Sequence, residues 1–139
     1  MTTLNPYIGF AGKCGEAMEF YKQCLGGGDL NILTVAGSPI ANQCPEAMQG
    51  QAMHAMLKKD DLVLMGTDMV SPEGYHFGNN IAISVSCSSE REINSFFDAF
   101  GAGGSVIDPL GIKFWGAWFG VVKDKYGIVW MFNFDPNAK

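Results

Sequence analysis

The sequence contains few charged residues, and positive charge is especially scarce. Only 17% of the 139 residues are charged, with 9 Lys and Arg against 14 Asp and Glu, which gives a net charge of −5. The basic residues are scattered and form no stripe that could follow a phosphate backbone or an anionic membrane surface. We therefore expect neither a nucleic-acid partner nor a membrane partner.

Long hydrophobic runs, targeting signals and paired cysteines are also missing. The longest apolar stretches, such as residues 62–65, have the length of a strand and are far too short to span a membrane. The first residues lack a basic segment followed by an apolar one, so we expect no signal peptide. The 4 cysteines form no C-x-x-C pair and no zinc-finger spacing with the 2 histidines. These features favour reduced thiols and a cytoplasmic protein.

Apolar residues are plentiful, and their spacing predicts secondary structure. Hydrophobic residues make up 47% of the chain, which is enough for the core of one domain spanning residues 1–139. A helical pattern ends at Gly26-Gly27-Gly28, and short runs of β character surround it. The first half is therefore expected to contain a strand at 4–10, a helix at 13–25, and strands at 30–35, 51–58 and 61–67.

The second half repeats this order of elements. Ser88 or Ser89 is a candidate N-cap with Glu92 completing a capping box, and a second glycine cluster ends the helix. The expected elements are a strand at 81–85, a helix at 89–100, and strands at 105–107, 115–123 and 128–134. We therefore predict an α+β fold of two βαβββ modules, at about 4–69 and about 79–135.

Matching residues support the repeat. Both glycine clusters follow a helix, whereas phosphate-binding loops precede one, so we interpret the clusters as helix C-caps and expect no Rossmann-type cofactor site. The matched positions are Phe20-Tyr21 with Phe96-Phe97, Gly27-Gly28 with Gly103-Gly104, Met65 with Met131, and Asn5 with Asn80.

Five further motifs are N-P-Y-I-G-F with E-A-M-E-F-Y-K-Q-C-L-G-G (5–27), H-A-M-L (54–57), L-M-G-T-D (64–68), W-G-A-W-F-G (115–120) and D-K-Y-G-I-V-W-M (124–131). Together they resemble the vicinal-oxygen-chelate superfamily, which includes glyoxalase, bleomycin-resistance and dioxygenase proteins. The similarity is to its PhnB-like branch, whose members are often described as demethylubiquinone methyltransferase-like. The resemblance implies paired modules whose strands curl into a cup around a ligand, usually in a homodimer. The glycine caps give the methyltransferase description no support.

The resemblance also implies where a metal would be bound. Enzymes of the superfamily hold a divalent cation at four positions, which fall here on Asn5, Met65, Asn80 and Met131. Asparagine offers a neutral oxygen and methionine a thioether that prefers soft Cu(I), and no carboxylate balances a 2+ charge. We therefore expect no metal of the family type and no cofactor.

Strand alternation predicts which residues face the cup. Asn5 and Tyr7 share one face of the first strand, and Asn80 shares a face with Ser84, whereas Ile81 and Ile83 should pack against the helix. A turn at Lys59-Asp60 would place His54 opposite Met65. His54 is therefore the candidate general base or ligand contact, with a structural role, hydrogen-bonded to a neighbouring strand, as the alternative. His76 is expected in a loop that could cover the cup.

The last hairpin provides the remaining candidates. A loop at 124–127 would place Trp118 opposite Asn133 on the face of Met131, where Trp118 would be a stacking wall for a planar ligand. Trp130 and Leu64 then belong to the helix side and the core. Asp68 and Asp124 are interpreted as turn or cap residues, and Cys14, Cys24 and Cys87 as packing residues.

These observations together predict a protein that binds a small organic molecule in a metal-free cup, with a homodimer as its assembly. The alternative is a small-metabolite enzyme of the lyase, isomerase or transferase type, which uses His54 as acid or base or holds a metal in another way. The candidate ligand-binding residues are Asn5, Tyr7, His54, Met65, Asn80, Trp118, Met131 and Asn133.

Overall fold

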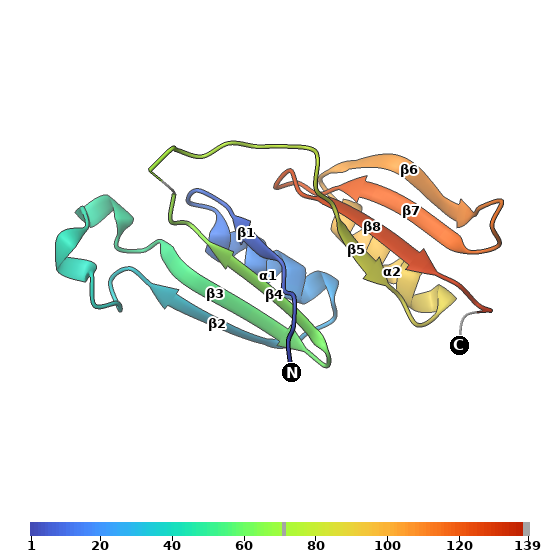
Figure 1. Ribbon diagram of the computed structural model, residues 1–139, viewed down its shortest axis with the longest axis horizontal. Helices are drawn as coiled ribbons and strands as arrows, with labels where there is room; N and C mark the ends of the chain where they lie inside the picture. Colours follow the sequence, from blue (N-terminus) through green and yellow to red (C-terminus); the bar gives the residue numbers. More distant parts are fainter. Residues whose placement is uncertain (71, 138–139) are drawn as a thin grey trace. The chain divides into compact units, whose positions relative to one another are not determined.

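The computed structural model describes residues 1–70 and 72–137, and the chain divides into two compact units. Met1–His76 form module 1 and Phe77–Lys139 form module 2. Each module has the order βαβββ, as the repeat predicts, with one helix against a four-stranded mixed sheet (Figure 1). No helix in the described part of the chain is long and apolar enough to cross a membrane.

In module 1 the first strand pairs with the last. The sheet has the order β1-β4-β3-β2, with β1 parallel to β4 and the other pairs antiparallel. Two short 3-10 turns, at Ala41–Gln43 and Glu46–Met48, lie between β2 and β3. The elements are β1 (Tyr7–Gly9), α1 (Cys14–Cys24), β2 (Asp29–Thr34), β3 (Ala52–Lys59) and β4 (Leu62–Thr67).

Module 2 repeats the topology with the order β5-β8-β7-β6 and a parallel β5–β8 pair. The edge strand β6 is longer than the sequence predicts, and it pairs with β7 through two irregularities in register. The elements are β5 (Ile83–Ser86), α2 (Glu90–Gly101), β6 (Ser105–Ile112), β7 (Trp118–Lys123) and β8 (Val129–Phe134).

Each helix covers one face of its sheet and builds a core there. The Ser89 side chain accepts a hydrogen bond from the Glu92 backbone N–H, which confirms the expected N-cap of α2. Phe100 of α2 packs on Trp130 of β8, with ring centroids 4.6 Å apart, and Trp130 is 3% exposed. The prediction that Trp130 belongs to the core is confirmed. The buried residues of the two helices are Cys14, Ala17, Met18, Tyr21 and Cys24 in α1, and Ile93, Phe96, Phe97 and Phe100 in α2.

The matched glycines occupy positions where the chain passes close to the next hairpin. A Cβ on Gly28 would lie 2.8 Å from the Lys58 carbonyl oxygen, and one on Gly104 would overlap the Lys123 carbonyl oxygen. Because β3 and β7 are equivalent strands, these contacts explain why the glycine pair recurs. Both clusters follow the end of a helix, as predicted.

The hairpin of module 1 differs from the prediction by one residue in its turn. Lys59 pairs with Leu62, so the two-residue turn is Asp60-Asp61 rather than Lys59-Asp60. Met65 therefore pairs with Met56 and not with His54. The direct pairing of His54 with Met65 is wrong, but His54 lies two residues from Met56 and still shares its face, because faces alternate with a period of two.

The β7–β8 hairpin of module 2 also differs from the prediction, and here the difference moves side chains to the opposite face of the sheet. Asn133 pairs with Phe119, and Trp118 pairs with Phe134. Asp124 is the cause, because its carboxylate accepts backbone N–H groups of Tyr126 and Ile128 and holds Ile128 in the loop. The prediction that Trp118 faces Asn133 on the side of Met131 is therefore wrong.

Candidate functional site

The sheet of module 1 has two faces, and α1 covers one of them. A Cβ on Gly66 would lie 3.1 Å from Sγ of Cys14, so Gly66 points at the helix and its neighbour Met65 points away. Met65 pairs with Tyr7 on one side and with Met56 on the other, and these pairs share a face. We call this the open face of module 1, and it comprises Tyr7, Asn31, Leu33, His54, Met56 and Met65.

Tyr7 and His54 are in contact on the open face. The Tyr7 hydroxyl lies 3.3 Å from Nδ1 of His54, and their ring centroids are 5.7 Å apart. His54 is half-buried, whereas Tyr7 is 52% exposed. The structure thus brings together three predicted site residues, Tyr7, His54 and Met65. The polar pair offers a ligand both a donor and an acceptor beside two thioethers.

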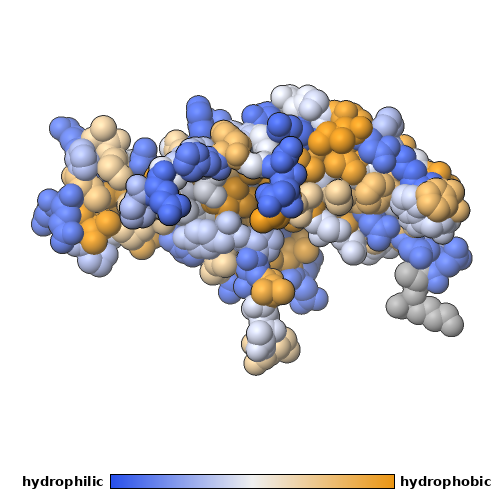
Figure 2. All heavy atoms as spheres, turned by 45° about the horizontal axis from the view of Figure 1, so that its top comes forward, coloured by the Kyte–Doolittle hydropathy of each residue, from blue (hydrophilic) through white to orange (hydrophobic). Residues whose placement is uncertain are grey.

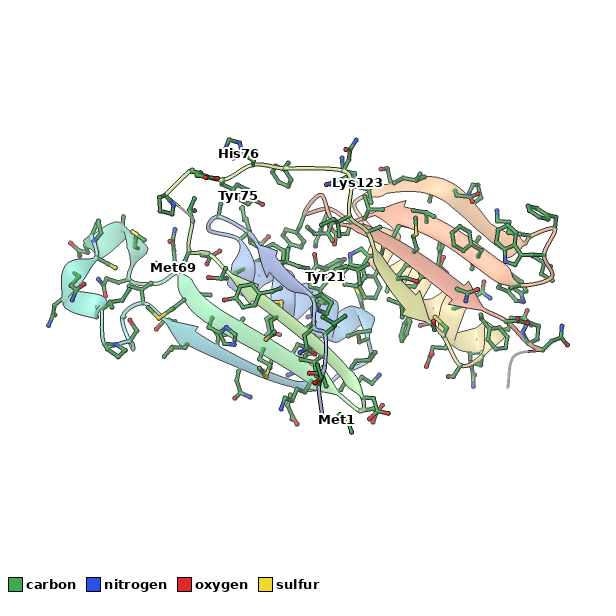
Figure 3. All side chains as sticks on the ribbon, viewed as in Figure 1. Met1, Tyr21, Met69, Tyr75, His76 and Lys123 are labelled. Carbon is green, nitrogen blue, oxygen red and sulfur yellow. The ribbon has the colours of Figure 1, made fainter. Side chains whose placement is uncertain are left out.

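Tyr75 is a residue that the sequence reasoning missed. Its hydroxyl donates to the Gly9 carbonyl oxygen at 2.9 Å, and its ring lies 3.7 Å from the position that a Gly9 Cβ would occupy. Gly9 shares the face of Tyr7, so Tyr75 covers the end of the open face (Figure 3). Burial raises the pKa of the Tyr75 hydroxyl, which stays protonated. The sequence signal that could have identified Tyr75 is the group of aromatic residues around His76.

His76 itself lies in the connection, as expected. One of its ring nitrogens, Nε2, is 3.2 Å from the Glu73 carbonyl oxygen, and the side chain is exposed.

Two buried carboxylates act as structural caps, as their interpretation predicts. Asp68 is 4% exposed and accepts the backbone N–H groups of Gly12, Cys14 and Ala52 at 2.7–2.8 Å. It therefore joins the start of α1 to the start of β3. Asp124 is 3% exposed and accepts from the Trp130 indole N–H at 2.8 Å in addition to its turn contacts. Neither carboxylate belongs to the open face.

The sheet of module 2 also has an open face, built by a different aromatic residue from the one predicted. A Cβ on Gly120 would clash with Phe97 of α2, so Gly120 and Trp118 point to the helix side while Phe119 points away. Phe119 pairs with Asn133, and Trp115 packs edge-on against Phe119 with centroids 5.6 Å apart. The open face of module 2 comprises Ser84, Ser86, Phe119, Val121, Met131 and Asn133.

Asn5 and Asn80 precede the strands on which they were expected. β1 begins at Tyr7 and β5 at Ile83, and both asparagines are exposed. Ile81 also precedes β5 and is 79% exposed, so its predicted packing against α2 is wrong.

The match of Asn5 with Asn80 is also wrong. Tyr7 lies beside Met65 and Ser84 lies beside Met131, so Tyr7 and Ser84 are the equivalent residues of the two first strands. Residue identity suggested the match of the asparagines, but it does not show where each strand begins.

The donors at these positions do not fit the metal that the superfamily implies. Met65 is flanked by Tyr7 and Met56, and Met131 by Ser84 and Val121, so each module offers a thioether without a carboxylate. Within residues 1–70 and 72–137 no three His, Cys, Asp or Glu side chains come together to hold an ion. A hard or borderline divalent cation prefers oxygen, imidazole or thiolate ligands with compensating charge.

The buried thiols are unsuited to nucleophilic chemistry. Burial raises the pKa of Cys14 to about 12, with the negative charge of Asp68 adding to the effect. Burial likewise raises the pKa of Cys87 to about 12, where Glu92 contributes and a backbone hydrogen bond opposes it. A thiol with such a pKa is protonated at neutral pH and does not act as a nucleophile.

The two βαβββ modules define a protein of the glyoxalase-like fold. A glyoxalase-related enzyme of Fulvimarina pelagi shares this fold with a TM-score of 0.60 and 17% identity, covering 98% of this chain and 89% of that one. A family model described as 3-demethylubiquinone-9 3-methyltransferase matches residues 2–132. The chain belongs to this PhnB-like family.

Three relatives match over nearly their whole length. Protein PA1353 of Pseudomonas aeruginosa has a TM-score of 0.84 and 36% identity, with 97% of this chain and 98% of that chain covered. The PhnB protein of Bacillus cereus has a TM-score of 0.76 and 24% identity, with 96% and 99% covered. Protein YjdN of Escherichia coli is 29% identical over 138 residues, which cover 94% of this chain and 93% of that protein.

Proposed function

We propose that the protein binds a small organic molecule on the open face of module 1, without a metal. The observation that supports this proposal is the Tyr7–His54 pair, with 3.3 Å between the hydroxyl and Nδ1, beside Met56 and Met65. A few convergent polar groups on an apolar surface are typical of sites for small organic ligands.

The neighbouring side chains favour a ligand with an apolar body and one polar oxygen. Met56 and Met65 are half-buried, and methionine adapts its shape and contacts aromatic rings favourably. The Tyr7 hydroxyl and the imidazole of His54 can donate to or accept from a carbonyl or hydroxyl group of the ligand. None of the six residues that define the open face is a carboxylate, so a cationic ligand beside Tyr7 and His54 would have no counter-ion among them.

The proposal does not include methyl transfer, although the description of the family names it. The glycine clusters that a methyl-donor site of the Rossmann type would use follow α1 and α2 here and end those helices. The residues of the open face provide hydrogen bonds and apolar contact rather than a phosphate- or nucleotide-binding loop.

Catalysis by His54 is a second candidate function, and the contact with Tyr7 favours it. A hydroxyl held at Nδ1 fixes the orientation of the imidazole and directs Nε2 away as an acid or base. The reaction would be a proton transfer on a small metabolite, of the lyase, isomerase or transferase type.

Thermal unfolding with a panel of small metabolites tests the first candidate. A ligand at 100 times its Kd adds about 2.7 kcal/mol to the free energy of unfolding and raises the melting temperature. The Tyr7→Phe and His54→Gln variants should lose this response, while Asn42→Ala, an exposed position in a 3-10 turn, should keep it. Retention of the full response by Tyr7→Phe and His54→Gln would refute a site on the open face.

Turnover distinguishes the two candidates. An enzyme should convert a panel member, and His54→Gln should abolish that conversion. A binding protein should show the thermal response with no conversion. The same panel in the presence of Zn²⁺, Ni²⁺ or Mn²⁺ should give unchanged results, because the open face offers no anionic ligand. One tightly bound ion of this kind per chain would contradict the metal-free proposal.

We also propose a homodimer and a cytoplasmic location. Edge strands expose unpaired backbone groups that proteins usually cover, and β6 exposes Val106, Ile107 and Ile112 on such an edge. Figure 2 shows apolar side chains at the surface of module 2. Sedimentation at micromolar concentration should give about twice 15.0 kDa, and a monomer would contradict the proposal. The half-buried thiol of Cys44 suits a reducing compartment.

A further inference from the structure

Three neutral side chains that can bind a metal lie together on the open face of module 1. His54 and Met56 are two residues apart on β3 and therefore point to the same side of the sheet. Met65 of β4 is the direct partner of Met56 across the strands. The face thus presents one imidazole and two thioethers, all on half-buried residues.

The distances set by strand pairing are suitable for one small ion. Directly paired residues have Cβ atoms roughly 4.5–5.5 Å apart, and diagonal neighbours such as His54 and Met65 are roughly 7–8 Å apart. Methionine has three rotatable bonds, so the sulfurs of Met56 and Met65 can converge on a point near the imidazole. Such convergence requires side-chain movement only.

The Tyr7 hydroxyl is placed to orient the imidazole of His54. Its hydroxyl lies 3.3 Å from Nδ1, so an Nδ1–H group can donate to it while Nε2 keeps its lone pair. A histidine that binds a metal through one nitrogen usually donates the other N–H to such a partner, which fixes the tautomer and the ring orientation.

The character of the donors selects a soft monovalent ion. Thioether ligands prefer Cu(I), whereas Mg²⁺, Ca²⁺ and Mn²⁺ prefer carboxylate and carbonyl oxygens. The nearest neighbours on this face, Asn31 beside Met56 and Leu33 beside His54, bring no carboxylate. Lys58, the next residue on this face of β3, pairs with Asp29, so its positive charge faces an opposite charge.

We propose that His54, Met56 and Met65 bind Cu(I), with Tyr7 as the residue that positions His54. The site includes Met65, one of the four positions that the superfamily implies for its metal, but it lies within module 1 and uses an imidazole and two thioethers in place of carboxylate ligands. It does not depend on the organic ligand proposed above, since the ion requires only side chains of β1, β3 and β4.

Cysteine thiols are the competitors that a test must exclude. The pKa values of Cys14 and Cys87 are raised to about 12 by burial, so both thiols are protonated at neutral pH, and Cys24 is buried. Cys44 is half-buried and lies between the two 3-10 turns. All measurements should therefore use a Cys44→Ser background.

The test is a titration with Ag(I), a redox-stable analogue, and with Cu(I) kept reduced by ascorbate. Native mass spectrometry should show one ion per chain, and competition with a colorimetric Cu(I) chelator should give the affinity. His54→Ala, Met56→Leu and Met65→Leu should each weaken binding more than roughly 100-fold, because each removes a ligand, and Tyr7→Phe should weaken it about tenfold. Met48→Leu, in the second 3-10 turn, should bind as the parent does.

Two results would overturn the proposal. One is that the Cys44→Ser protein retains no ion after titration with Ag(I) or with Cu(I). The other is an affinity unchanged by Met56→Leu and Met65→Leu, which preserve side-chain volume and are well tolerated in folded proteins. NMR of methyl-labelled methionine makes the assignment direct. The Met56 and Met65 signals should shift with Ag(I) and that of Met131 should not, and the reverse pattern would place the ion elsewhere.

Discussion

The indole N–H of Trp130 donates to the buried carboxylate of Asp124 at 2.8 Å, six residues earlier in the chain. The same carboxylate holds the β7–β8 loop, and the indole ring packs on Phe100 of α2. One contact therefore connects the turn, the last strand and the helix of module 2. Trp130 combines a satisfied polar atom with a buried aromatic ring, which makes it a central residue of that core.

Replacing Trp130 should destabilise the protein more than replacing Trp118. Trp130→Ala removes a ring from a core and should cost about 3–5 kcal/mol in the free energy of unfolding. Trp118 is half-buried, so Trp118→Ala should cost less than about 3 kcal/mol. Urea unfolding measures both values. A larger loss for Trp118→Ala would contradict the central role of Trp130 in this core.

The adjacent glycines Gly27 and Gly28 allow the cost of a positive φ to be separated from the cost of limited space for a side chain. Gly27 has φ of +126° with no atom within 4 Å of the position that a Cβ would occupy, so Gly27→Ala should cost only the conformational strain, about 1–2 kcal/mol. Gly28 has φ of +128° and also faces the Lys58 carbonyl oxygen, so Gly28→Ala should cost more. Thermal and urea unfolding of the two variants should differ by at least about 1 kcal/mol. Equal losses would indicate that space at Gly28 is unimportant.

Removal of the Asp68 carboxylate should loosen the start of α1. Asp68→Ala leaves three backbone N–H groups without their acceptor, and each unsatisfied group costs about 1–3 kcal/mol. We expect a total loss above about 3 kcal/mol, together with faster amide exchange at Cys14 and Ala52. Asp135→Ala is the control, because Asp135 is exposed and its replacement should change stability by less than about 0.5 kcal/mol. Unchanged exchange at Cys14 would contradict the capping role.

Stability should decrease in alkaline solution because of the buried thiols. The pKa of Cys14 is raised from 9.0 to about 12, so between these values the unfolded chain loses a proton that the folded protein keeps. The free energy of unfolding should therefore fall as pH rises through this range, by up to about 1.4 kcal/mol per pH unit for each thiol. Below about pH 9 this contribution is fully retained.

The Cys14→Ala and Cys87→Ala variants should show a shallower decrease between about pH 9 and about pH 12, measured by urea unfolding at each pH. The comparison of slopes removes the effect of the lower starting stability of each variant. Parallel curves for all variants would show that other groups cause the loss.

The sequence predicted the helices and strands of both modules, but it predicted the register of neither hairpin correctly. Loop length explains why only one of the two errors moved side chains to the opposite face. In the β3–β4 hairpin the turn moved by one residue along the chain, which changed partners by two positions and left His54 on the face of Met65. In the β7–β8 hairpin the loop became one residue longer, and this exchanged Trp118 for Phe119 on the open face. An odd change in register reverses every side chain of a strand, whereas an even change reverses none.

Side-chain contacts decided the parts of the site that periodicity could not predict. The extra loop residue in module 2 depends on the hydrogen bonds of the Asp124 carboxylate, and a sequence pattern does not show which N–H groups an aspartate will accept. Tyr75 reaches Gly9 from the connection after β4, a contact between segments far apart in the chain. By contrast, the apolar face of α2 and its Ser89 cap were predictable because helix caps and helical spacing are local signals.

The parallel pairing of β1 with β4 has a consequence for the order in which module 1 can assemble during synthesis. β1 leaves the ribosome first, but its hydrogen-bonding partner is the last strand of the module, so β1 must wait until Thr67 has emerged. Contacts between segments distant in the chain form slowly, because the intervening loop must first be closed. The α1–β2–β3 segment can begin to form earlier, and Tyr7 reaches Met65 and His54 only when the sheet is completed. A nascent chain truncated before β4 would therefore contain His54 and Met56 but not the complete open face of module 1.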